Sequence, residues 1–154
     1  MGKGCIELGE KKANLVKQSQ GMLSVNTPGK GLTEITQEVD QWVRRQDISI
    51  GLITVFIRHT SASLMVQENA DPSVMRDLEV YFEKIAPEDP ALYSHTAEGP
   101  DDMPAHIKCA LTETTLSIPV NKKCMALGIW QGIFVFEHRA RPHVRQIVLH
   151  LSGI

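Results

Sequence analysis

The chain has 154 residues, of which 42% are hydrophobic and 22% charged, and its formal net charge is −2. This size and balance are typical of one folded domain over residues 1–154 and argue against disorder. A slightly acidic chain gives no reason to expect nucleic acid as a partner. Three distant cysteines without a CxxC pair disfavour a disulfide framework, and no segment is long enough to span a membrane. We therefore expect a cytoplasmic protein.

The first half of the chain predicts strands and helices in succession. Two short strands are expected at 12–18 and 22–25, ending in a Pro28-Gly29 turn. Apolar positions at helical spacing predict a helix over 34–45, capped by Thr33. The apolar run 50–58 predicts a strand buried on both faces, and a second strand follows at 64–67. Asp71 is expected to cap a helix that continues to residue 85.

The second half begins with a segment, 87–103, that has no apolar periodicity. Such long loops are usually functional or disordered. Pro104 is expected to open a short helix through 111, followed by strands at 117–120, 125–136 and 146–151. Because strands and helices do not alternate strictly, the sequence predicts an α+β fold, a compact mixed β-sheet domain with about three helices.

Two polar clusters flank the short strand at 64–67. His59, Thr60 and Ser61 follow the buried strand, where polar side chains often line a pocket. They also suit a strand-end turn whose hydroxyls satisfy the backbone. Glu68 and Asn69 precede a helix start and are candidates for binding a cation or a substrate amine. The alternative for Glu68 is a solvated loop.

The strongest local signal lies in the 95–106 segment. His95, His106, Glu98, Asp101 and Asp102 place two imidazoles and three carboxylates within twelve residues. Neutral imidazoles suit zinc, iron, nickel or copper, whereas carboxylates suit magnesium or manganese. The spacing matches no standard zinc motif. One acid is also explained as a helix cap, but that accounts for only one member of the group.

A fourth cluster joins Trp130 and Gln131 to the Glu137-His138-Arg139 run. An unbroken strand would place Glu137 and His138 on opposite faces, unless a bulge intervenes. Basic residues gather mildly here, and such a group can receive a small anion; they are Arg139, Arg141 and Arg145. Two further histidines, His143 and His150, are interpreted as structural.

In this order the clusters resemble the YjbQ-like family, described as a secondary type of thiamine-phosphate synthase. The matching runs are HTSAS at 59–63, ENADP at 68–72, EGPDDMPAHIK at 98–108, LGIWQG at 127–132 and EHR at 137–139. The resemblance extends from about residue 14 to the C-terminus. Ile129 departs from the pattern, because the family usually has threonine there.

The resemblance implies an α+β homotrimer with a histidine-centred metal site between subunits. It implies His95, His106 and His138 as ligands of a divalent ion, zinc or magnesium, and His59 as an acid/base group or phosphate contact. The other catalytic candidates are carboxylates for magnesium and an arginine for phosphate: Glu68, Asp101, Asp102 and Arg139. The substrate-binding candidates are Thr60, Ser61, Asn69, Trp130, Gln131 and Arg145.

Three functions follow as hypotheses. The first is a transferase that joins hydroxymethylpyrimidine diphosphate to thiazole phosphate and releases pyrophosphate, for which a cation or arginines would stabilise the leaving group. The second is a metal-dependent hydrolase of a small phosphorylated or amide substrate. The third is a non-catalytic trimer that binds a metal or small ligand.

Overall fold

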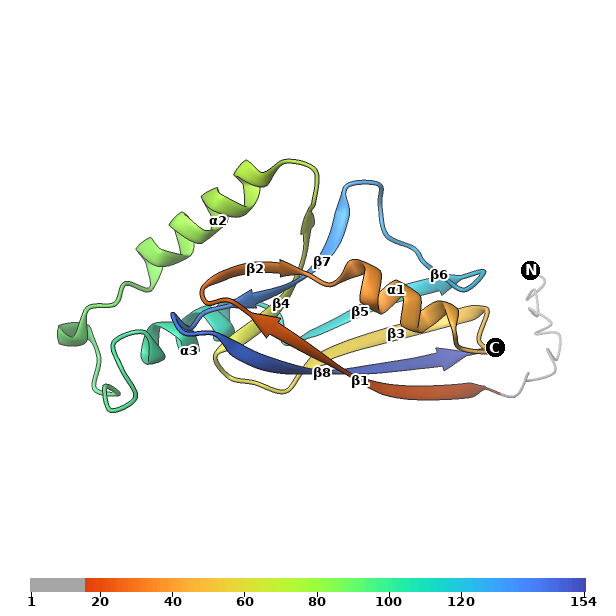
Figure 1. The fold of residues 1–154 in the computed structure, drawn as a ribbon, viewed down its shortest axis with the longest axis horizontal. Helices are drawn as coiled ribbons and strands as arrows, with labels where there is room; N and C mark the ends of the chain where they lie inside the picture. The colour runs from red at the N-terminus through yellow and green to blue at the C-terminus, as the bar shows by residue number, and fades with distance from the viewer. Residues whose placement is uncertain (1–15) are drawn as a thin grey trace, which may run out of the picture.

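The computed structural model describes residues 16–154, and its strands form two antiparallel sheets. The five-stranded sheet has the order β1-β8-β3-β5-β6, and the three-stranded sheet has the order β2-β7-β4 (Figure 1). The strands are β1 (Lys17–Thr27), β2 (Gly31–Glu34), β3 (Ile50–Ile57), β4 (Ala62–Glu68), β5 (Thr115–Asn121), β6 (Cys124–Met125), β7 (Gln131–Glu137) and β8 (His143–Gly153).

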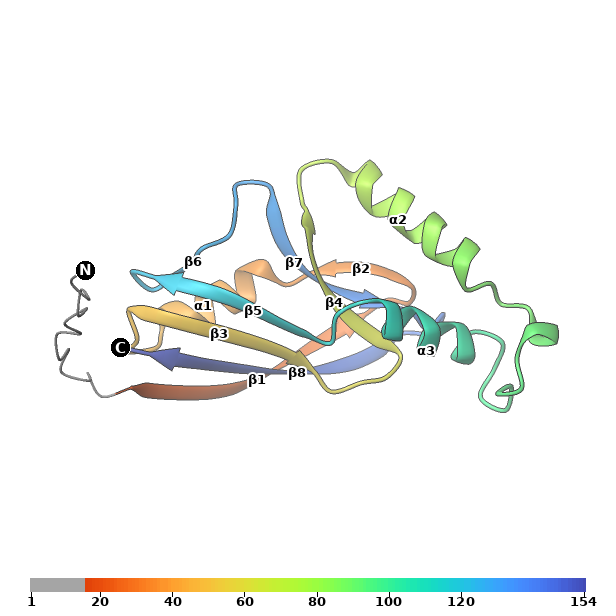
Figure 2. The same cartoon turned by 180° about the vertical axis from the view of Figure 1, so that it is seen from behind.

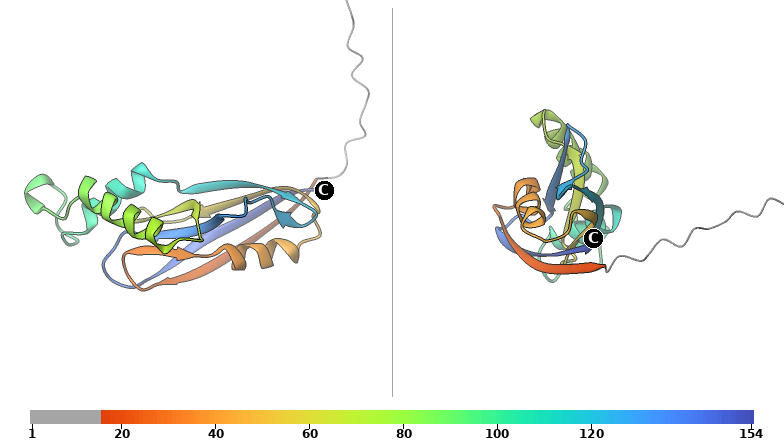
Figure 3. Two further views of the ribbon diagram at one scale, coloured as in Figure 1. Left: turned by 90° about the horizontal axis from the view of Figure 1, so that it is seen from above. Right: turned by 90° about the vertical axis from the view of Figure 1, so that its right-hand side faces the viewer.

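Three α-helices accompany the sheets within the described residues, which confirms the predicted α+β class. They are α1 (Thr36–Arg44), α2 (Pro72–Ile85) and α3 (Asp102–Leu111), with a short 3-10 helix η1 (Pro90–Leu92) in the loop after α2. In Figure 3, α2 and α3 lie at the end of the molecule opposite to the C-terminus. No helix within 16–154 is long and apolar enough to cross a membrane.

The core lies between the two sheets and α1. Alternate residues of β3 and β8 point into it, and Val39 and Val43 of α1 are fully buried there. Strand β7 is buried along nearly its whole length, because its second face is also covered. On that second face Phe136 meets Phe82 of α2, with ring centroids 5.2 Å apart. The end of β7 is therefore held from both sides.

The prediction that the strand at 50–58 is buried on both faces is wrong for the isolated chain. Ile53, Val55 and Ile57 are buried, but Leu52 and Phe56 on the other face are each 42% exposed. An antiparallel strand needs only one face on its own core. The apolar residues on the outer face are left uncovered, and Figure 2 shows β3 and β5 in front of α1.

Four element boundaries also differ from the sequence prediction. The strands expected at 12–18 and 22–25 form one strand, because β1 pairs with β8 at every residue from 17 to 27; positions 12–15 lie outside the described residues. Thr33 is not a helix cap but pairs with Val135, and α1 begins at Thr36. The strand expected at 125–136 is divided between the two sheets as β6 and β7. Helix α3 begins at Asp102, two residues before Pro104.

One buried ion pair ties the two sheets together. Arg145 of β8 donates from Nε and Nη2 to the carboxylate of Glu137 on β7, at 2.6 and 2.5 Å. Thr27 of β1 donates to the same carboxylate at 2.7 Å. Burial raises the pKa of Glu137, but the hydrogen bonds from Arg145 and Thr27 outweigh it and hold the pKa below its ordinary value. The pair is therefore charged at neutral pH.

Removing one partner of this pair leaves a charge buried without compensation. We expect Arg145→Ala to lower the free energy of unfolding by about 3–5 kcal/mol, measured by urea denaturation. Arg76→Ala removes an arginine from the exposed surface of α2 and should change stability by no more than about 0.5 kcal/mol. Equal stability of the two variants would contradict this role for Arg145.

Candidate functional site

The first turn of α3 gathers two imidazoles around one carboxylate. Asp102 and His106 stand four residues apart on one face of the helix, and His95 reaches Asp102 from the preceding loop. His95 Nε2 lies 2.8 Å from Asp102 Oδ2, and His106 Nε2 lies 3.4 Å from the same oxygen. Asp102 is only 2% exposed. Donor atoms of the three residues all lie within 4.8 Å of one another.

Arg139 fixes the acidic residues of this cluster. It follows β7 and donates to Asp102 through Nη1, to Asp101 through Nε at 3.1 Å, and to the Glu98 carbonyl through Nη2 at 2.9 Å. The Ala140 amide adds a bond to Asp101 at 2.9 Å. Burial raises the pKa of Asp101, but the hydrogen bonds and the charge of Arg139 bring it below its ordinary value. Arg139 therefore positions the carboxylates and has three of its donor groups engaged.

The tautomer of His106 is set by the backbone. Its Nδ1 lies 3.0 Å from the carbonyl oxygen of Thr60, which can only accept, so Nδ1 carries the hydrogen. In the neutral ring Nε2 is then unprotonated and faces Asp102. Ligating histidines in metal sites commonly have their second nitrogen held in this way. Thr60 thus contributes through its main chain.

His59 lies beside this group but has a different environment. Its Nε2 accepts from the backbone N–H of Gln146 at 2.9 Å, so the neutral ring carries its hydrogen on Nδ1. Burial, followed by the charge of Arg145, lowers the pKa of His59. His59, Thr60 and His106 share the wall of a shallow cavity of about 330 Å³. The geometry favours a hydrogen-bond donor at Nδ1 over a base at Nε2.

Three other candidates at this end of the sheet face inward. His138 is 1% exposed, and its Nε2 lies 2.9 Å from the hydroxyl of Ser63. Burial lowers the pKa of His138 to about 3, so the ring is neutral. Arg145 is paired with Glu137 and also donates to the hydroxyl and carbonyl of Ser61. The cluster of possible metal donors within the described residues contains His95 and His106 but not His138. The contacts of Arg145 with Glu137 and Ser61 hold neighbouring strands together, which is a structural role.

The remaining candidates lie at the other end of the three-stranded sheet. Ala62 pairs with Glu137, whereas Glu68 pairs with Gln131, six residues further along β4. That separation corresponds to about 20 Å along an extended strand. Trp130 is 61% exposed in the loop before β7, and the Gln131 side chain accepts from the Gly128 amide. Asn69 contacts Glu34 at 3.3 Å. One chain therefore holds two separate polar groups.

Two buried polar residues near the first group are not among the site residues predicted from the sequence. Lys108 of α3 is 2% exposed and donates to Glu83 of α2 at 2.6 Å, which attaches α2 to the rest of the chain. Ser63 is fully buried against His138. Both belong to the runs that carry the family resemblance, and that was the only available signal, because a lysine or serine by itself predicts exposure.

Fold and site together define an α+β domain of two antiparallel sheets with a His/Asp cluster at the start of its third helix. The model of the UPF0047 protein YjbQ-like family matches residues 21–154. The chain belongs to this YjbQ/UPF0047 family. A UPF0047 protein of Synechocystis is 48% identical over 137 residues, which is 89% of this chain and 93% of the relative. UPF0047 protein YjbQ of Escherichia coli O157:H7 is 39% identical over 87% of this chain and 97% of the relative.

Solved structures agree with this assignment. A conserved hypothetical protein from Thermus thermophilus superposes with a TM-score of 0.75 at 35% identity, covering 83% of this chain and 97% of that one. A protein of unknown function from Sulfolobus solfataricus gives a TM-score of 0.84 at 22% identity, covering 91% and 100%, and shows likeness of fold alone. The YjbQ-like fold predicted from the sequence is confirmed.

The contact between His59 and the Gln146 amide leads to a spectroscopic prediction. We expect His59 to be neutral at pH 7 with its hydrogen on Nδ1, and to titrate below the ordinary histidine pKa of 6.5. Long-range ¹H–¹⁵N correlation spectra of the imidazoles measure both properties, and His59→Gln assigns the signal. A ring protonated on Nε2 at pH 7 would contradict the structure.

Proposed function

We propose that the chain is a metal-dependent enzyme of small phosphorylated molecules, with a divalent ion held by His95, Asp102 and His106. The single observation that carries this proposal is the convergence of two imidazole nitrogens and one carboxylate oxygen within 4.8 Å. Sites that perform chemistry on a metal typically use three protein ligands and leave a position for water or substrate.

The donor set fits such an ion chemically. Two imidazoles with one carboxylate is a common ligand set for catalytic zinc, and oxygen ligands also suit magnesium. The Thr60 carbonyl engages Nδ1 of His106, which leaves Nε2 as the nitrogen that a metal would take. Asp102 is itself a proposed metal ligand, and its ion pair with Arg139 holds the carboxylate in one orientation. His138 lies outside this set and has in our proposal a structural role, packed against Phe136 and hydrogen-bonded to Ser63.

Bound there, a divalent ion would act as a Lewis acid toward a phosphoryl oxygen or would lower the pKa of a water molecule. The chain's own residues would perform the positioning. His59 lines the neighbouring cavity and has Nδ1–H as its remaining donor, and Arg139 pairs with Asp102 and so holds it in one orientation. Buried Glu137 and Arg145 hold the end of β7, from which Arg139 projects.

The reaction to test first is the one that the family resemblance implies. A bond forms between the thiazole nitrogen and the pyrimidine methylene carbon, while the bond to the diphosphate oxygen breaks and pyrophosphate leaves. A cation beside the diphosphate favours this departure because it stabilises the developing charge. A hydrolase would use the same site with water as the nucleophile, and the set of two histidines and one carboxylate equally favours it.

Metal content is the direct test of the site. We expect about one divalent ion per chain in protein purified without chelators, and at least tenfold less in His95→Ala and in His106→Ala. Arg76→Ala is the control, because Arg76 lies on the exposed surface of α2. Elemental analysis measures all four proteins. Unchanged metal in His106→Ala would remove that residue from the ligand set.

Activity decides between the two reactions. Metal-loaded protein should release pyrophosphate and form thiamine phosphate only when both substrates are present, and His106→Ala should reduce the rate at least a hundredfold. Phosphate release without the thiazole would instead identify a hydrolase. Metal binding with no turnover in either assay would leave the non-catalytic role and refute the enzyme proposal.

We also propose a homotrimer in which one subunit's second polar group completes a neighbour's site. Glu68 lies about 20 Å along β4 from Ala62, at the end of the strand away from the His/Asp cluster. A site that combines the two polar groups therefore needs a second copy. The outer face of the five-stranded sheet supports association, because Met22, Val148 and Phe56 pair side by side across β1, β8 and β3. Exposed apolar rows of this kind mark interfaces.

A charge in this apolar row should prevent association. We expect Phe56→Glu to convert the trimer to monomer in light scattering after gel filtration, because a buried carboxylate without a partner is costly. Gln37→Glu places the same charge on the exposed side of α1 and should leave the trimer intact. A wild-type monomer, or an unchanged Phe56→Glu oligomer, would refute this interface.

A further inference from the structure

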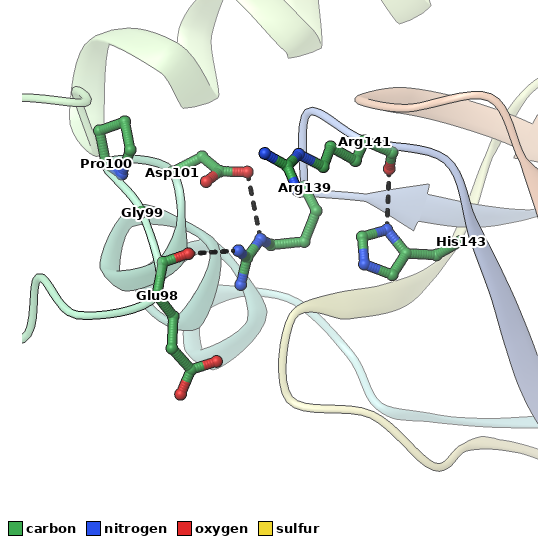
Figure 4. A pocket seen from close by; sticks show the side chains of 7 residues that line it. All are labelled: Glu98, Gly99, Pro100, Asp101, Arg139, Arg141 and His143. Atoms are coloured by element: carbon green, nitrogen blue, oxygen red, sulfur yellow. Dashed lines mark hydrogen bonds and ion pairs between the residues drawn. The ribbon is translucent and has the colours of Figure 1, made fainter.

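A cavity of about 360 Å³ lies beside the His/Asp cluster, between the 98–101 turn and the connection from β7 to β8. It is lined by Glu98, Gly99, Pro100, Asp101, Arg139, Arg141 and His143. Figure 4 shows that its walls come from these two segments alone. The first segment leads directly into Asp102 of α3, so the cavity adjoins the candidate metal ligands.

The three arginines near this cavity differ in whether their guanidinium donors are free to bind a ligand. Arg145 is 3% exposed and paired with Glu137. Arg139 lines the cavity, but its charge is matched by Asp101 and Asp102. Within residues 16–154 the guanidinium of Arg141 has no hydrogen bond or ion pair, and the residue is exposed. Arg141 is therefore the arginine with donors free for a ligand.

His143 adds a second polar group with a fixed orientation. Its Nδ1 lies 2.8 Å from the carbonyl oxygen of Arg141, so that nitrogen carries the hydrogen and Nε2 is left for another partner. The one unpaired acid on the lining does not oppose an anion directly. In Figure 4 the carboxylate of Glu98 points away from Arg139, while its carbonyl accepts from that arginine.

We infer that this cavity binds the phosphate group of a phosphorylated ligand, with Arg141 as the charged donor and Nε2 of His143 as an acceptor for a protonated phosphate oxygen. The planar guanidinium suits two oxygens of a phosphate at once. The volume exceeds that of inorganic phosphate, so part of an attached organic group is accommodated. The inference deepens the proposed function, because a phosphate held here is next to the His95–Asp102–His106 ion site.

Inorganic phosphate is the probe, titrated into the full chain by isothermal calorimetry with and without zinc. We expect binding to wild-type protein in both conditions, about tenfold weaker in Arg141→Ala and intermediate in Arg141→Lys, which keeps the charge without the fork. Arg76→Ala is the matched control and should bind like wild type. The imidazole signals of His143 should shift on phosphate addition and stay unchanged in Arg141→Ala.

Two results would overturn the inference: absence of phosphate binding at millimolar concentration, or equal binding by Arg141→Ala and wild type. Acetate that binds as tightly as phosphate would also overturn it, because a general anion site does not select phosphate. These outcomes are separate from the metal test. Phosphate binding by a protein that contains no metal on purification and takes up no added zinc would support this cavity and refute the metal proposal. Metal binding without phosphate binding would support the metal site and refute this cavity.

Discussion

The buried pair of Glu137 and Arg145 is the interaction on which the arrangement of the site depends. It joins the three-stranded sheet to the five-stranded one at the point where β7 ends. Because the strand end is fixed, Arg139 leaves it in a defined direction and reaches Asp101 and Asp102. These bonds tie the first residues of α3, from which His106 projects, to the end of β7. A charge pair in the core thus controls the position of a cluster near the surface.

The three arginines of the β7–β8 region have three different roles, which the amino-acid composition alone does not distinguish. Arg145 joins the sheets, Arg139 positions carboxylates, and Arg141 keeps its donors free at the cavity. The difference follows from alternation along the chain and from depth. Arg145 lies on the inward face of β8, whereas Arg141 lies in the turn between the strands. Phosphate recognition, expected first at Arg139 and Arg145, is better supported at Arg141.

The two polar groups of the chain lie apart and do not form one site within a single subunit. The His/Asp cluster and the Glu68–Trp130 group occupy opposite ends of the three-stranded sheet. The outer face of the five-stranded sheet carries apolar residues at positions where an isolated domain would place polar ones. Both features are explained together if copies of the chain associate, since association would bury the apolar row and bring separate groups into one site.

The sequence alone predicted the α+β class from the order of its elements and the family from five ordered motifs. It also predicted the cap of α2 by Asp71 and a polar cluster over 95–106 that contains His95, Asp102 and His106, because these two features depend on patterns within a few residues. It did not determine that β1 is continuous, that the 125–136 segment divides between two sheets, or which arginines are free. Those properties depend on strand pairing and on which face meets the core. Such contacts join residues far apart in sequence, so only the tertiary structure decided them.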